Sequence, residues 1–209
     1  MQSDDVEFDG EKVVNLKTKE EITRKEIGNK VMCSSNAPLS ATEAFSSPVS
    51  PPPFMVGIAE VEIDKETGVV EPIDYAAVVD CGTVVNPNLA RVQTEGGIAQ
   101  GIGMALYEDI IYSEKGKNYS NSFMQYKIPS RLDVGEIRVE FESSYEPTGP
   151  FGAKSIGEIV INTPSPAISN AVQNAVGVIV RELPITAEKV YKGMAEKRNK
   201  KQVCKKQSI

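Results

Sequence analysis

The segment FMVGIAEVEIDKETGVVEPIDYAAVVDCG, residues 54–82, contains the clearest secondary-structure pattern in this chain. Apolar residues alternate along 54–63, and a second run rich in β-branched residues covers 69–80. The polar stretch 64–68 between the two runs ends in glycine and has the composition of a turn. Period-two alternation on both sides of a turn predicts a β-hairpin.

A helix, a second hairpin and a strand are predicted after this segment. Residues 88–108 have a helical pattern, with Asn86 or Asn88 as the residue that caps the first turn. Residues 110–126 are typical of a hairpin around a Lys-Gly pair, and residues 136–143 alternate as a strand.

Two more helices are predicted towards the C-terminus. The first starts at Thr163 and Pro164, because proline suits the first turn of a helix. Its apolar stripe comprises Ala167, Ile168, Ala171, Val172, Ala175, Val176 and Ile179. The last helix begins at Thr186, with Val190 and Met194 facing the core. Hairpins and separate helices together predict an α+β fold, in which small sheets pack with helices.

The chain divides into three predicted regions. Residues 1–53 are expected to be an irregular N-terminal segment of the same domain, with a short hairpin around an Asp-Gly pair and a short helix over 16–28. Residues 54–196 form the main domain, and residues 197–209 a basic, flexible tail. A solvated tail is the simpler interpretation, and a nucleic-acid-binding arm is the alternative.

Charge and hydropathy exclude several classes of protein. The 209-residue chain has a net charge of −6 and a pI near 4.9, which argues against nucleic acid as its main partner. No apolar run is long enough to span a bilayer, and the acidic N-terminus MQSDDVEFDG is unlike a signal peptide. We therefore expect a cytoplasmic protein without membrane contact.

The absence of histidine restricts the possible chemistry. The chain has no histidine, and its three cysteines are scattered without a C-x-x-C pair. This composition excludes Ser-His and Cys-His triads and disfavours zinc and iron–sulfur sites within the chain, so we expect no metal-ligating residues here. Acid–base chemistry must then use carboxylates, Lys, Tyr or Cys.

The predicted helix 88–108 contains an unusual number of glycines. Each glycine lowers helix stability by about 0.5–1 kcal/mol relative to alanine. The four are Gly96, Gly97, Gly101 and Gly103. Close packing against another backbone explains them without any function. Alternatively, a ligand approaches the helix, since Gln93, Gly97 and Gln100 share one face and could bind a polar ligand.

A second glycine-rich segment, GPFGAKSIGE, covers residues 149–158. Its glycines allow left-handed conformations and its proline favours a turn, so the loop can present Lys154, Ser155 and Glu158 towards a pocket. From the pattern alone, Glu158 is either a solvated carboxylate or a general base. A base would need an environment that only the fold can supply.

Five segments in one order carry a family resemblance: EVEIDKETG, VVDCGTVVNP, QTEGGIAQGIGMALYE, YKIPS and GPFGAKSIGE. They resemble the C-terminal part of the molybdenum-binding subunit of the xanthine dehydrogenase and aldehyde oxidase family, which also includes carbon monoxide dehydrogenases and nicotinate hydroxylases. The resemblance covers about residues 54–194, and 1–53 more weakly. It corresponds to roughly the last quarter of such a subunit.

The resemblance implies a molybdopterin cofactor with molybdenum, often in its cytosine dinucleotide form, and a small-molecule substrate. It also implies partners: the remainder of the molybdenum subunit, and iron–sulfur and flavin (FAD) subunits within an oligomeric enzyme. We expect the isolated chain to be inactive. A folded fragment or assembly module without catalysis is the alternative.

The resemblance also implies residue roles. Glu158 matches the catalytic base of the family, which performs oxidative hydroxylation with water-derived oxygen. Gln93 matches a glutamine that contacts the pterin. The residues that match the cofactor-lining loop are Lys154, Ser155, Ile156 and Gly157, and Gly97 and Gln100 are further candidates.

Overall fold

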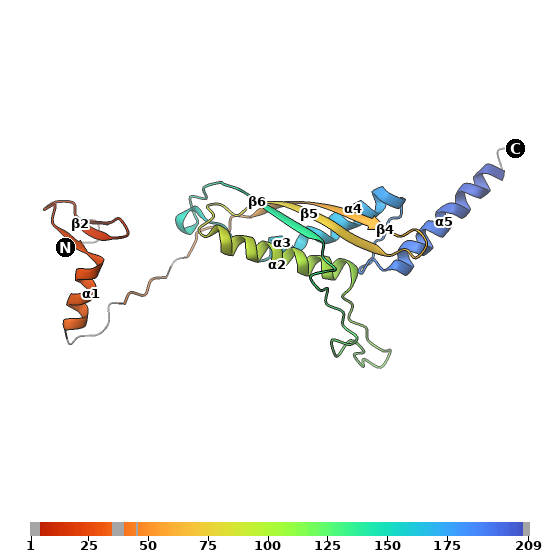
Figure 1. Ribbon diagram of the computed structural model, residues 1–209, viewed down its shortest axis with the longest axis horizontal. Coiled ribbons are helices and arrows are strands. Elements are labelled where there is room, and N and C mark those ends of the chain that lie inside the picture. Colours follow the sequence, from red (N-terminus) through yellow and green to blue (C-terminus); the bar gives the residue numbers. More distant parts are fainter. Residues whose placement is uncertain (1–4, 35–39, 45, 207–209) are drawn as a thin grey trace. The chain divides into compact units, whose positions relative to one another are not determined.

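The structure is a computed structural model that describes residues 5–34, 40–44 and 46–206 (Figure 1). It comprises two compact units, Met1–Ser46 and Ser47–Ile209. Within the described ranges, no helix combines the length and the apolar character needed to cross a bilayer.

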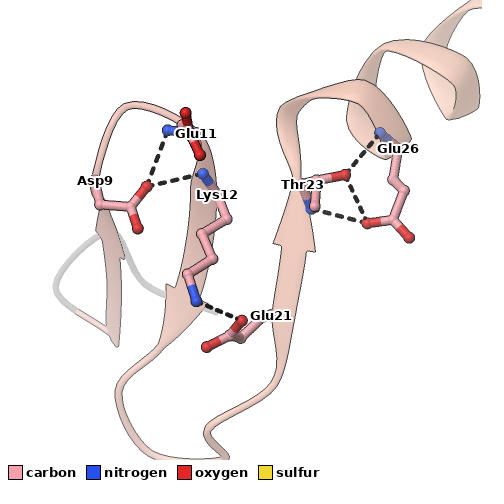
Figure 2. A network of polar contacts seen from close by, with 6 residues as sticks. All are labelled: Asp9, Glu11, Lys12, Glu21, Thr23 and Glu26. Carbon is pink, nitrogen blue, oxygen red and sulfur yellow. Dashed lines mark hydrogen bonds and ion pairs between the residues drawn. The ribbon is translucent and has the colours of Figure 1, made fainter.

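The first unit is a three-stranded antiparallel sheet followed by a helix. Strands β1 (Val6–Phe8), β2 (Lys12–Asn15) and β3 (Glu21–Thr23) pair in that order, and α1 covers Arg24–Cys33. The predicted hairpin around the Asp-Gly pair is confirmed. Figure 2 shows that the Asp9 carboxylate accepts hydrogen bonds from the backbone N–H groups of Glu11 and Lys12, both 2.9 Å long. Gly10 follows with a φ of 100°, so this turn uses the left-handed freedom of glycine.

The irregular segment expected over 1–53 is therefore wrong for residues 6–33, and the helix expected over 16–28 is present only from Arg24 onwards. Residues 21–23 pair as β3, and a capping box at Thr23 and Glu26 starts α1 immediately afterwards. Glu26 N–H donates to Thr23 Oγ1 at 3.2 Å, and Thr23 N–H donates to Glu26 Oε2 at 2.9 Å (Figure 2). The helix then continues through Gly28 instead of ending there.

The Ser- and Pro-rich stretch 34–54 lies at the end of the segment expected to be irregular, and it falls partly outside the described residues, at 35–39 and 45. Its described part from 46 to 53 contains neither helix nor strand, as predicted.

The second unit is built on the predicted hairpin, which is confirmed. Strand β4 (Phe54–Ile63) pairs antiparallel with β5 (Val70–Asp80), and β6 (Glu136–Glu142) pairs parallel with the other edge of β5. In the turn, Gly68 has a φ of 81° and its N–H donates to the Asp64 carbonyl oxygen at 2.7 Å. The order β4-β5-β6 leaves β5 in the centre of the sheet.

In the described part of this unit, four α-helices and a short 3-10 helix (Pro150–Gly152) accompany the sheet (Figure 1). The α-helices are α2 (Pro87–Leu106), α3 (Ile159–Asn162), α4 (Pro164–Val176) and α5 (Ala187–Lys206). Of the two predicted caps for α2, Asn86 is correct, because its Oδ1 accepts from Leu89 N–H at 3.1 Å. The short helix α3 was not predicted. The tail expected from residue 197 is helical as far as Lys206, and 207–209 lie outside the described residues.

One face of the sheet forms the core with these helices, which confirms the α+β prediction. The fully buried residues of this core include Tyr75, Val79 and Val139 from the strands and Ile98, Ile102, Ile168, Val172 and Val190 from the helices. Ile179 does not belong to this stripe. Gly177 ends α4 in a left-handed conformation, so Ile179 lies beyond the helix and is 55 % exposed.

The segment between α2 and β6 has the predicted hairpin-like turn. Tyr112 and Asn118 form an isolated antiparallel bridge, and Gly116 between them has a φ of 77°.

Candidate functional site

The glycines of α2 serve two different purposes. A Cβ added at Gly97 would lie 2.1 Å from Val160 Cγ2, and one at Gly101 would lie 2.6 Å from Pro164 Cγ. These two glycines therefore allow α3 and the start of α4 to pack directly on α2. A Cβ at Gly96 would meet no atom within 4 Å. Close packing accounts for Gly97 and Gly101, whereas Gly96 faces open space.

That open space is a groove of about 730 Å³ between α2 and the start of α3. We call it the amide groove, after the carboxamides of Gln93, Gln100 and Asn162 that line it. Its other lining residues are Val92, Gly96, Gly97, Gly157, Glu158 and Ile161. Its volume lies in the range usual for small-molecule sites, about 300–1,000 Å³. The predicted residues Gln93, Gly97, Gln100, Gly157 and Glu158 are thus brought together.

Gln93 links the two sides of the amide groove. Its side-chain N–H donates to the carbonyl oxygen of Gly157 at 3.4 Å, although 64 residues separate them in the sequence. A Cβ added at Gly157 would meet no atom within 4 Å, so the backbone there is open to the groove.

Glu158 immediately precedes α3, and its exposed side chain makes no capping hydrogen bond to that helix. Buried contacts hold α3 in place. Val160 is fully buried against Gly97, and Thr163 Oγ1 accepts a hydrogen bond from the Tyr75 hydroxyl at 2.8 Å. Burial raises the pKa of Tyr75, which keeps this hydroxyl protonated as a donor.

The loop 149–158 that leads to Glu158 runs beside the end of β5. Gly152 accepts from Thr83 N–H at 2.8 Å, and Lys154 N–H donates to the Cys81 carbonyl oxygen at 2.7 Å. Of the loop's three glycines, Gly152 is left-handed, with a φ of 80°. Gly149 and Gly157 do not adopt the left-handed conformation that was expected for the glycines of this loop.

Lys154 is directed towards β5. Its Nζ lies 2.6 Å from Asp80 Oδ2 and 5.5 Å from the centroid of the Phe54 ring, and its side chain is only 8 % exposed. This ammonium group, together with hydrogen bonds from Ser144 Oγ and Gly82 N–H, lowers the pKa of Asp80 to about 2. The Asp80 carboxylate is therefore ionised at any physiological pH.

The predicted cofactor-lining loop is thus divided between two hollows. Lys154 and Ile156 line an adjacent hollow of about 370 Å³ at the start of α2, which Gln93 also borders. Gly157 lines the amide groove, and Ser155 is exposed and lines neither of them.

Four lining residues of the amide groove were missed by sequence reasoning: Val92, Gly96, Ile161 and Asn162. Val92 and Gly96 lie on the helix face that Gln93 and Gln100 define, so helical spacing could have found them. Ile161 and Asn162 depended on recognising α3. In the described part of the chain, no cluster of three or more His, Cys, Asp or Glu side chains could hold a metal ion.

The sequence profile of the molybdopterin cofactor-binding domain matches residues 1–135, a range that includes α2 and ends before the loop 149–158. The chain is 36 % identical over 142 residues to subunit gamma of the 6-hydroxypseudooxynicotine dehydrogenase complex of Paenarthrobacter nicotinovorans, covering 66 % of this chain and 18 % of that protein.

The same similarity extends to other relatives and to solved structures. The chain is 34 % identical over 154 residues to the xanthine dehydrogenase molybdenum-binding subunit of Escherichia coli O157:H7, covering 73 % of this chain and 20 % of that protein. The crystal structure of Cu,Mo-CO dehydrogenase matches with a TM-score of 0.76 and 25 % identity over 94 % of this chain and 26 % of that one. The chain spans about a fifth of the length of these curated relatives.

Proposed function

Because this chain belongs to the family of molybdopterin cofactor-binding domains found in xanthine dehydrogenase-type molybdenum enzymes, we propose that it is the C-terminal segment of a molybdenum hydroxylase. It supplies cofactor contacts from the amide groove and Glu158 as the catalytic base for hydroxylation of a small molecule with water-derived oxygen. One observation carries the proposal: Gln93, Gly157 and Glu158 meet at one groove.

The amide groove fits a pterin in its chemistry. Gln93, Gln100 and Asn162 offer both donors and acceptors, which match the mixed heteroatoms of a pterin ring. At Gly96 and Gly157 the added Cβ would meet nothing within 4 Å, so a flat group can approach both backbones. We also propose that the cofactor is in its cytosine dinucleotide form.

Glu158 is the residue that moves a proton in this proposal. Its carboxylate is exposed at the groove, and α3, which starts directly after it, is fixed by Val160 and Thr163. When bound, the cofactor supplies the two-electron redox chemistry of the hydroxylation. The carboxylate accepts the proton that water-derived oxygen releases, and Gln93 keeps the loop before it close to α2.

The surface supports assembly into a larger enzyme. Val56, Ile58 and Val78 are exposed on the outward face of the sheet, and Phe123 and Leu132 are 80 % and 94 % exposed after α2. Such apolar surface is typical of a site that another polypeptide covers. We propose the remainder of the molybdenum subunit as that polypeptide, with iron–sulfur and flavin subunits completing a cytoplasmic oligomer.

The alternative is an assembly module that never contacts a cofactor, and the same exposed apolar residues favour it. Gly96→Leu separates the two, because leucine favours a helix and its side chain would start in the open space of the groove, where an added Cβ meets no atom within 4 Å. In the enzyme assembled from this chain and the remainder of the molybdenum subunit, we expect about tenfold lower molybdenum and pterin content in the Gly96→Leu variant than in the native chain. Asn174→Leu, at an exposed position of α4, is the control. Equal cofactor content in both variants would leave only the assembly role.

A further inference from the structure

We propose that Asp80 and Lys154 form a positioning clamp that holds the loop 149–158 against the end of β5, so that Glu158 faces the amide groove. The role in catalysis rests on the proposed function, whereas the clamp itself is a property of this fold. Neither residue lines the amide groove, and Lys154 lines the adjacent hollow instead.

Both oxygens of the Asp80 carboxylate accept hydrogen bonds at the end of its strand. Oδ1 accepts from Ser144 Oγ at 2.6 Å and from Gly82 N–H at 3.0 Å, while Oδ2 faces Lys154 Nζ at 2.6 Å. Three segments of the chain therefore meet at one side chain: the strand end, the segment after β6, and the loop.

Lys154 has no freedom to point elsewhere in this arrangement. Its side chain is buried between the carboxylate and the ring of Phe54, the first residue of β4. A buried ammonium that loses its carboxylate is strongly unfavourable, so removing either partner should release the loop. Removing both charges should be less harmful than removing one.

Three further hydrogen bonds hold the loop in place. Backbone hydrogen bonds join Lys154 to Cys81 and Gly152 to Thr83, and Gln93 holds the Gly157 carbonyl oxygen. Glu158 directly follows this last contact. The clamp thus fixes Lys154, the first residue of the short span 154–158, and Glu158 is the last residue of that span.

Hydrogen exchange of the full 209-residue chain tests the clamp. In Asp80→Asn and Lys154→Met we expect the backbone amides of Thr83 and Lys154 to exchange at least about tenfold faster, as loss of a charged hydrogen bond implies. The double variant should exchange more slowly than either single one. Asp74→Asn is the matched control, because it breaks the Arg138 ion pair of the same strand. Unchanged exchange in both single variants would overturn the clamp.

Two further variants keep the test decisive. Lys154→Arg keeps the charge, so loop exchange should stay close to that of the native chain even if the neutral variants fold poorly; release of the loop in this variant would contradict a charge clamp. In the assembled enzyme, Asp80→Asn should lower kcat with little change in KM. A rise in KM at constant kcat would overturn the positioning role.

Failure of the proposed function is distinguishable from failure of the clamp. Glu158→Gln should leave loop exchange unchanged while it removes turnover. If that variant kept its turnover, the role of Glu158 would be wrong, and the exchange of the Asp80 and Lys154 variants would still decide whether the clamp exists.

Discussion

The side-chain N–H of Gln93 donates a hydrogen bond, 3.4 Å long, to the carbonyl oxygen of Gly157, the residue directly before Glu158. This contact joins the second turn of α2 to the loop that precedes α3. It places a carboxamide and a carboxylate at one groove, and the account of the site depends on that proximity.

Replacing Gln93 with alanine should weaken cofactor retention. The variant loses one hydrogen-bonding group of the amide groove and its contact with Gly157, so we expect about tenfold weaker retention in the assembled enzyme. Molybdenum content after extensive dialysis measures it. Gln173→Ala, at an exposed position of α4, should behave like the native chain. Equal retention in both variants would remove Gln93 from the site.

Adjacent glycines of α2 should respond to alanine in opposite directions. At Gly97 the new methyl group would overlap Val160, and overpacking of this kind lowers the free energy of unfolding by about 1–3 kcal/mol. At Gly96 the methyl group meets nothing, and helix propensity should raise the free energy of unfolding by about 0.5–1 kcal/mol. Urea denaturation of the purified chain measures both values. Equal effects at the two positions would contradict the packing of α3 on α2.

The Asp80–Lys154 pair should make stability sensitive to acid. The pKa of Asp80 is lowered from 3.8 to about 2 in the folded chain, so the ionised carboxylate stabilises the fold above pH 3.8. That contribution is lost as the pH falls towards 2. We expect Asp80→Asn to lower the free energy of unfolding by about 2 kcal/mol at neutral pH, and by progressively less below pH 3.8. Denaturation curves at several pH values would contradict this if the difference stayed constant.

Tyr75 should support the site through its hydroxyl group. The Tyr75 hydroxyl donates to Thr163 Oγ1. A Cβ at Gly57 would lie 1.9 Å from the Tyr75 hydroxyl oxygen, so the absence of a side chain at Gly57 makes room for this contact. Tyr75→Phe keeps the ring and removes the bond, which should lower the free energy of unfolding by about 1 kcal/mol. Thermal unfolding should show a small decrease in Tm. An unchanged Tm would mean that this contact does not anchor the start of α4.

Local patterns predicted a large part of the fold. The alternation of residues 54–80 predicted the β4–β5 hairpin, and Asn86 was one of the two residues predicted to cap α2. The parallel pairing of β6 with β5 was not predicted, because register between distant strands depends on tertiary packing. The capping box of Thr23 and Glu26 is visible in the sequence, and it predicts the correct start of α1.

Local patterns also predicted part of the site. Helical spacing alone placed Gln93, Gly97 and Gln100 on one face. The partner of Lys154 was not predictable from spacing, since Asp80 lies 74 residues away and only the fold brings the two together. Open space at Gly96 and close packing at Gly97 likewise depend on where α3 lies.

The most direct test of the central claim is the turnover of Glu158→Gln in the enzyme assembled from this chain and the missing segment, at equal cofactor content. Glu66→Gln, in the exposed β4–β5 turn, is the matched control. We predict that Glu158→Gln lowers kcat about 10²–10⁴-fold, as expected for loss of a general base, while Glu66→Gln has no effect. Equal turnover of the two variants would contradict the assignment of Glu158 as the catalytic base.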